Sequence, residues 1–259
     1  MIHRFAALIC AAVFVLLAAC GGTTETKSSE SSGSATAEPP APAVAPADAA
    51  TIAGKVTFTG TAPPRRPVSM DATPACARQH DKAVLSEEVV VNDNGTLRNV
   101  FVYVKEGLPA GKWPVPDAPV TIDQIGCVYK PHVIGVMVDQ DVEFLNNDPT
   151  NHNIHPLPRL NREWNESQPP KGEPKLKSFA KPEIGIPVKC NIHPWMRVYI
   201  NVVEHPFHAV TGEDGSFSIK GLPPGEYTIE AWHERYPAQQ IKVKVGPGTT
   251  ETAEFKFAG

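Results

Sequence analysis

From residue 51 onward, short runs rich in Val, Ile, Phe and Tyr alternate with turns rich in Gly, Pro, Asn and Asp. This alternation is typical of an all-β chain, in which short strands are joined by tight turns. The 259 residues include 27 Pro and 19 Gly, which interrupt the chain throughout its length beyond the first twenty residues. Helical bundles and coiled coils are therefore excluded, and the length suffices for one or two domains with cores of their own.

The apolar runs predict strands along most of this region, and only residues 73–82 suggest a helix, a short one. Asn92-Asp93-Asn94-Gly95 predicts a hairpin turn. Residues 156–174 are polar and rich in proline, and predict a long loop. The expected strands are 52–59, 88–91, 99–104, 120–124, 129–132, 133–139, 141–146, 175–179, 186–190, 198–203, 208–210, 216–219, 227–233, 240–245 and 252–257.

Residues 1–20 read as an export signal rather than as part of the fold. Arg4 precedes an apolar run from Phe5 to Ala19, which is shorter than a typical membrane-spanning helix. The ending Leu-Ala-Ala-Cys20 resembles the bacterial lipoprotein box, and this resemblance implies cleavage before Cys20 and acylation of its thiol. Ordinary signal cleavage that leaves a free Cys20 is the alternative. Acyl chains would hold the protein at a membrane of the cell envelope, facing the periplasm or the exterior.

Residues 21–50 contain no aromatic residue and are rich in Ser, Thr, Ala and Pro. Such a segment buries too little apolar surface to offset the entropy of ordering, so we expect a flexible linker.

The formal net charge of the chain is −4, and the sequence contains no block of basic residues. A nucleic acid is therefore not an expected partner.

Residues 210–236, VTGEDGSFSIKGLPPGEYTIEAWHERY, resemble the carboxypeptidase-regulatory-like β module, which has a prealbumin-like sandwich fold. The resemblance covers about 55 residues and says little about function. It divides the chain into a domain at 51–204 with an N-terminal β extension and a module at 205–259. Residues 52–60 also resemble the first strand of such modules, so that insertion of one domain in the other stays open.

Two segments carry residues suited to metal chemistry. Cys190, His193 and Met196 follow one expected strand within seven residues, and His152 lies at the end of another. Two histidines, a thiolate and a weak axial thioether form the ligand set of blue-copper electron-transfer sites. An unrelated structural cysteine with a nearby histidine and methionine is the alternative.

The Cys-x2-His-x2-Met spacing and the upstream His-Asn-Ile segment resemble the cupredoxins, above all amicyanin and plastocyanin. This resemblance covers roughly residues 118–204 and implies a Greek-key β-sandwich or barrel with one type 1 copper. It implies that His152, Cys190, His193 and Met196 bind the metal, and that Asn153 braces the ligand loop. It further implies electron exit at an exposed edge of His193, with Pro194 and Trp195 in a docking patch for a redox partner such as a c-type cytochrome. For Trp195, a place in the core is the alternative.

Five cysteines occur without a Cys-x2-Cys motif, which excludes a zinc ribbon, a thioredoxin-type dithiol and a c-type haem site. With Cys190 given to a metal and Cys20 to lipid, Cys76 and Cys127 form an even pair, which outside the cytoplasm suggests a disulfide. The alternative is a second metal site that combines this pair with His80 and His132.

We expect four further histidines to be structural or exposed: His155, His205, His208 and His233. Of these, His155 is the one that could touch the copper site.

The sequence leads to a lipid-anchored blue copper protein that carries single electrons between redox partners of the envelope. Two other functions stay open: copper handling without redox turnover, and a metal-free structural or adhesive envelope protein. An enzyme is not expected, because multicopper oxidases and copper nitrite reductases need further histidine pairs, and no His-x-His motif occurs.

Overall fold

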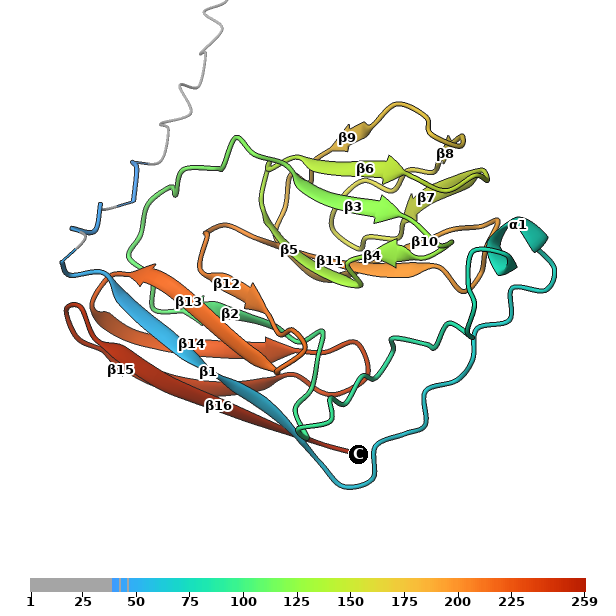
Figure 1. Cartoon of the computed structure of the whole chain (residues 1–259). Coiled ribbons are helices and arrows are strands. Elements are labelled where there is room, and N and C mark those ends of the chain that lie inside the picture. The colour runs from blue at the N-terminus through green and yellow to red at the C-terminus, as the bar shows by residue number, and fades with distance from the viewer. Residues whose placement is uncertain (1–38, 42, 46) are drawn as a thin grey trace, which may run out of the picture. The chain divides into compact units, whose positions relative to one another are not determined.

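The computed structural model describes residues 39–41, 43–45 and 47–259. The expected signal, the acylated Cys20 and most of the expected linker lie outside this range. Within it, the chain forms sixteen strands and one helix of four residues, α1 (Pro74–Ala77), so that the expected all-β class is confirmed (Figure 1). No helix among these residues has the length and apolar character needed to cross a membrane.

One β-sandwich, here called the terminal sandwich, combines strands from both ends of the described chain. Apolar side chains of its two sheets share one core, which includes Ile52, Val102 and Phe255. The sheets have the strand orders β13-β1-β16 and β12-β2-β14-β15. The strands are β1 (Ala50–Thr59), β2 (Phe101–Glu106), β12 (His208–Val210), β13 (Ser216–Leu222), β14 (Gly225–Trp232), β15 (Gln239–Val245) and β16 (Thr250–Ala258).

The second β-sandwich, here called the inner sandwich, is built from residues between these strands. Its core includes Ile122, Phe144 and Ile200, together with Cys190 and Met196. The sheets have the orders β4-β3-β6-β9 and β5-β11-β10-β7-β8. The strands are β3 (Val120–Gln124), β4 (Tyr129–Lys130), β5 (Val133–Met137), β6 (Val142–Asn146), β7 (His152–Pro156), β8 (Glu166–Gln168), β9 (Lys175–Lys177), β10 (Glu183–Lys189) and β11 (Arg197–Val203).

The sequence placed a boundary after residue 204 and left insertion of one domain in the other open, and sheet membership shows an insertion. β1 pairs antiparallel with β13 and parallel with β16, and β2 pairs with β12 and β14. Both early strands therefore belong to the terminal sandwich, and the inner sandwich is inserted in it. The physical reason is that Ile52, Val56 and Phe58 of β1 are buried in the core of the terminal sandwich, and both strands that hydrogen-bond to β1 come from the C-terminal end of the chain.

Two local expectations are also wrong. The expected loop at 156–174 contains β8, because the side chain of Gln168 is fully buried and its amide donates to the carbonyls of Phe144 and Glu173. Residues 88–91 form no strand beyond an isolated bridge between Val91 and Leu97. The turn at 92–95 closes this bridge, with the Gly95 N–H donating to the Asn92 carbonyl at 2.9 Å.

Candidate metal centre

The segment from Cys190 to Met196 is a tight loop between two paired strands. Its ends are fixed by the antiparallel pairing of Lys189 in β10 with Arg197 in β11. Within the loop, the Met196 N–H donates to the His193 carbonyl at 2.9 Å, and the Cys190 N–H donates to the Met196 carbonyl at 3.3 Å. These bonds fold the loop back on itself and bring its side chains toward one region.

His152 begins the neighbouring strand β7, and Asn153 in this strand bonds both to the loop and to Tyr129 of β4. The side-chain oxygen of Asn153 accepts the Asn191 N–H at 2.6 Å, and the hydroxyl of Tyr129 donates to the Asn153 carbonyl at 2.7 Å. Asn153 therefore links the segment of His152 to the segment of Cys190, which is the bracing position that the resemblance assigned to it.

The structure brings His152, Cys190 and His193 together. The two Nδ1 atoms lie 2.8 Å apart, and the sulfur of Cys190 lies 3.7 Å from Nδ1 of His193. One ligand atom from each residue lies within 4.8 Å of the others, and none of the three side chains is more than 1% exposed. Two imidazole nitrogens and a sulfur thus face one small buried volume.

Met196 is fully buried in the same apolar cluster as Cys190. A thioether is a weak ligand and an apolar group, so that its place in this cluster fits either a long axial bond or core packing. The backbone bonds of Met196 to Cys190 and His193 place it in the same closed loop as these two residues.

Asp148, which the sequence analysis did not single out, bonds to the other side of His152. Its Oδ2 lies 2.8 Å from Nε2 of His152 and also accepts the Cys127 N–H, while its Oδ1 accepts the Gly126 N–H. Burial alone would raise the pKa of this carboxyl, but these hydrogen bonds lower it. The ionised Asp148 therefore holds the Nε2 proton of His152 and leaves its Nδ1 free to bind a metal. The signal in the sequence was an aspartate four positions before the histidine.

The pKa directions of Cys190 and His193 favour metal binding. Burial raises the pKa of Cys190, but its hydrogen bond with His152 and three backbone N–H groups bring it below the usual value. Burial lowers the pKa of His152, whereas its bonds to Asp148 and Cys190 raise it above the usual value. Burial and the nearby charge of His152 lower the pKa of His193 to about 4, so that this imidazole is neutral at pH 7. A neutral imidazole beside a stabilised thiolate is what a soft metal ion requires.

Cys76 and Cys127 form a disulfide that closes a separation of 51 residues. This bond contradicts the alternative Cys2His2 metal site, because neither sulfur is a free thiol. The histidines of that alternative have other partners: Nε2 of His80 bonds to the Gly126 carbonyl at 2.7 Å, and Nε2 of His132 bonds to Glu234.

The expected exposed edge of His193 is wrong, since the residue is only 1% exposed. The sulfur of Cys76 lies 3.7 Å from Nε2 of His193, and the ring of Trp195 lies 5.1 Å from its ring. The segment that carries α1 therefore covers the imidazole. Pro194 is exposed and Trp195 is half-buried, with the indole N–H donating to the Cys127 carbonyl at 2.9 Å.

The other histidines lie away from the three ligand atoms. His155 bonds to Asn191 through Nδ1 at 3.2 Å and to Glu163 through Nε2 at 2.7 Å, so that both of its nitrogens have partners outside the centre. Three further histidines lie among residues of the terminal sandwich: His205, His208 and His233. Burial lowers the pKa of each of these imidazoles to about 4.

Comparison with known proteins gives one family match and several distant structural ones. Residues 194–258 match the family model of the carboxypeptidase regulatory-like domain, which supports the module expected at the C-terminal end. A comparison with curated proteins found no match. Three structural matches cover about a third of the chain at a TM-score of 0.30 or less.

One such match is a copper-containing nitrite reductase from Thermus scotoductus, with 25% identity and a TM-score of 0.30, over 38% of this chain and 25% of that chain. A Cu(I) structure of an amicyanin mutant matches with 20% identity and a TM-score of 0.30, over 34% of this chain and 85% of its own. A purple cupredoxin from Nitrosopumilus maritimus matches with 19% identity and a TM-score of 0.28, over 32% of this chain and 98% of its own.

Proposed function

We propose that the protein binds a single copper ion in the inner sandwich and uses it to carry electrons one at a time. The observation that supports this is the convergence of Nδ1 of His152, Nδ1 of His193 and the sulfur of Cys190 in one buried volume. A thiolate with two imidazoles and a nearby thioether is a donor set that selects copper over hard cations.

The residues present fit such an ion. The carboxylate of Asp148 occupies the Nε2 side of His152, so that only Nδ1 of this ring faces the centre. The backbone N–H groups around Cys190 stabilise a thiolate. The bond from the Asn191 N–H to Asn153 holds the loop against β7.

The bound copper would supply a one-electron couple between Cu(I) and Cu(II). The chain's own contribution is to hold its ligands in one geometry for both states, so that little rearrangement accompanies the electron. Strand pairing between β10 and β11 fixes the ends of the ligand loop, and burial of the three side chains excludes water from the centre. Retention of copper without redox exchange is the alternative, and it is distinguished by measuring whether the copper-loaded protein exchanges electrons with an added oxidant.

The test is titration of the purified protein with Cu(II), followed by visible spectroscopy. We expect one equivalent to bind with an intense thiolate-to-copper charge-transfer band, which disappears in Cys190→Ser. His155→Ala is the matched control, because His155 lies near the loop but bonds to Asn191 and Glu163, and its band should be unchanged. A colourless protein, or a band that survives in Cys190→Ser, would contradict the proposal. A coloured protein that exchanges no electrons would be a copper-handling protein.

The envelope location also stays a proposal, with a membrane held through the acylated Cys20 and a redox protein such as a c-type cytochrome as partner. Its support is the apolar run and the lipoprotein-like ending of residues 1–20. The location is tested below by a substitution at Cys20.

A further inference from the structure

The outer edge of the imidazole of His193 is closed off by a disulfide. Nε2 of His193 lies 3.7 Å from the sulfur of Cys76, and both Cys76 and Cys127 are fully buried. Because His193 itself is only 1% exposed, no edge of this ligand is open to a redox partner. An electron that leaves the centre must therefore pass through side chains that cover it.

This cover is fixed to the inner sandwich at several points. Besides the disulfide, Nε2 of His80 bonds to the Gly126 carbonyl at 2.7 Å, and the Cys127 N–H donates to Asp148 at 2.8 Å. Since Asp148 also bonds to His152, the covering segment and the candidate ligands form one connected network. The cover is part of the centre rather than a loose loop that lies over it.

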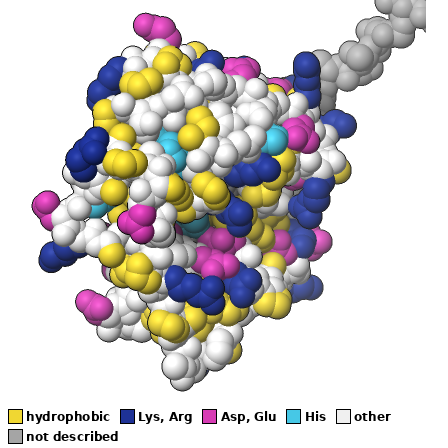
Figure 2. All heavy atoms as spheres, turned by 90° about the vertical axis from the view of Figure 1, so that its right-hand side faces the viewer, with side chains coloured by type: hydrophobic (Ala, Val, Ile, Leu, Met, Phe, Trp, Pro, Cys, Tyr) yellow, Lys and Arg dark blue, Asp and Glu magenta, His cyan; other side chains and the backbone are white. Residues whose placement is uncertain are grey.

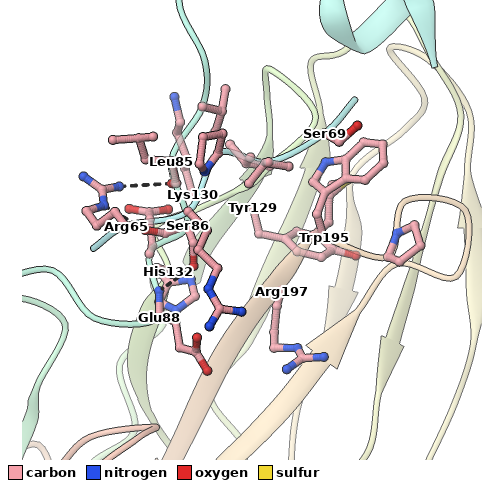
Figure 3. A pocket seen from close by; sticks show the side chains of 18 of the residues that line it. Arg65, Ser69, Leu85, Ser86, Glu88, Tyr129, Lys130, His132, Trp195 and Arg197 are labelled. Carbon is pink, nitrogen blue, oxygen red and sulfur yellow. Dashed lines mark hydrogen bonds between the residues drawn. The ribbon is translucent and has the colours of Figure 1, made fainter. Parts of the chain in front are cut away.

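Trp195 connects the centre to the surface. Its ring lies 5.1 Å from the ring of His193, and its N–H donates to the Cys127 carbonyl. The indole is half-buried and lines a groove of about 650 Å³ together with Tyr129 and Arg197. In Figure 3, Trp195 lies on one side of this groove, opposite Arg65 and Lys130.

The groove is polar enough to admit hydrated reagents. Four cationic side chains, including Arg66 and Lys130, and three carboxylates, including Glu87, line it. Figure 2 views the side of the molecule that carries α1 and shows Lys and Arg side chains next to Asp and Glu side chains there. Charged groups of either sign can therefore approach the exposed part of Trp195.

We propose that the Cys76–Cys127 disulfide closes the direct path from His193 to solvent, and that Trp195 and its groove form the path by which electrons enter and leave. The proposal rests on the proposed function. A conjugated ring in contact with the ligand offers a lower barrier to an electron than saturated side chains or a gap. Trp195 is thus a relay residue, and the groove is the surface that a redox partner must reach.

The first test measures electron exchange of the copper-loaded protein with two reagents of opposite charge. One electron passes from the reduced centre to hexacyanoferrate(III), which becomes hexacyanoferrate(II), or to tris(phenanthroline)cobalt(III), which becomes the cobalt(II) complex. We expect Trp195→Leu to slow both reactions severalfold while the charge-transfer band persists. The matched control is Trp164→Leu, because Trp164 is also half-buried and packs against Phe144 in the same core, away from His193. Equal rates in the two variants would overturn the proposal.

A second test needs no copper, so that failure of the proposed function can be told apart from failure of this inference. Diethyl pyrocarbonate modifies accessible imidazoles, and mass spectrometry locates the modified residue. In the metal-free protein we expect His193 to resist the reagent, and in the double variant Cys76→Ala, Cys127→Ala we expect it to react severalfold faster. His80→Ala, which keeps the disulfide and loosens only the end of the cover, should give an intermediate rate if the double variant is too unstable to study. Rapid modification of His193 in the unaltered protein would overturn the proposal, whether or not the protein binds copper.

Discussion

Nε2 of His152 lies 2.8 Å from a carboxylate oxygen of Asp148, and that same oxygen accepts the backbone N–H of Cys127. One buried carboxylate therefore orients a candidate metal ligand and holds the turn that carries the disulfide. Carboxylates in this position fix the tautomer of a ligating histidine and raise its basicity. Asp148 is the residue through which the covering segment and the centre are coupled.

Replacement of Asp148 by Asn keeps the size of the side chain and removes its charge. We expect Asp148→Asn to weaken copper affinity by about 10- to 100-fold, because the amide holds the Nε2 proton of His152 less strongly. Competition against a chelator of known affinity measures the change. The control is Asp123→Asn, since Asp123 bonds to Asn147 on the surface, away from the three ligand atoms. Unchanged affinity in Asp148→Asn would show that the carboxylate has only a structural role.

Glu183 predicts a pH dependence of stability outside the centre. Its buried carboxylate accepts the backbone N–H groups of Arg159, Leu160 and Asn161 at 2.6 to 3.2 Å. Burial alone would raise the pKa of Glu183, but these hydrogen bonds bring it below the usual value. A lowered pKa in the folded state means that the contribution to stability is present above the unfolded pKa of about 4.3 and is lost as the pH falls through the folded value.

We therefore expect Glu183→Gln to lower the free energy of unfolding by about 2 kcal/mol at pH 7, since hydrogen bonds to a charged group are the stronger ones. The difference between this variant and the unaltered protein should shrink as the pH is lowered below 4. Urea unfolding at several pH values measures both quantities. A difference that stays constant with pH would show that ionisation of Glu183 does not stabilise the fold.

The sequence predicts the position of individual strands better than it predicts which strands pair with one another. The strand at 120–124 was predicted to the residue, because Val, Ile and the flanking turns determine it locally. The placement of β1 beside β16 was left open: residues 52–60 resemble the first strand of the C-terminal type of module, but the sequence does not specify which strands this segment pairs with. The resemblance to a short ligand loop led to His152, Cys190 and His193, which the structure brings together.

What the sequence could not provide was the environment of these ligands. Cys76 lies 117 positions from His193, and only the folded chain shows that its sulfur covers the imidazole. The expectation of an exposed edge came from the family resemblance. It failed because the segment that contains α1 covers the imidazole of His193.

The disulfide should contribute strongly to stability. In the loop-entropy description, a cross-link that spans 51 residues restricts the unfolded chain and contributes about 4 kcal/mol. We expect the double variant Cys76→Ala, Cys127→Ala to unfold at a correspondingly lower urea concentration in the metal-free state. Comparison of the oxidised protein with its reduced and alkylated form under denaturing conditions confirms the bond by mass. A loss well below 1 kcal/mol would indicate that the unfolded chain is already compact in this region.

Cys20 provides the test of the proposed membrane anchor. Each buried methylene of an acyl chain contributes about 0.8 kcal/mol, so a multiply acylated protein should sediment with membranes. We expect Cys20→Ser, expressed in a bacterium with a lipoprotein pathway, to appear in the soluble fraction and to lack the added acyl mass. Cys10→Ser is the matched control, because Cys10 lies inside the segment that the proposed cleavage removes. Equal membrane association of the two variants would contradict acylation at Cys20.

Met196 allows the ligand role to be separated from the packing role. Leucine has nearly the same volume as methionine, and such exchanges in a core usually cost less than about 1.5 kcal/mol. Because Met196 is fully buried among apolar residues, we expect Met196→Leu to fold and to retain copper through His152, Cys190 and His193. If the thioether is an axial ligand, the visible spectrum and the reduction potential should both change, since the axial ligand tunes the potential of such centres. Phe179→Leu in the same cluster is the control for a loss of packing alone, and an unchanged spectrum in Met196→Leu would show that Met196 serves only the core.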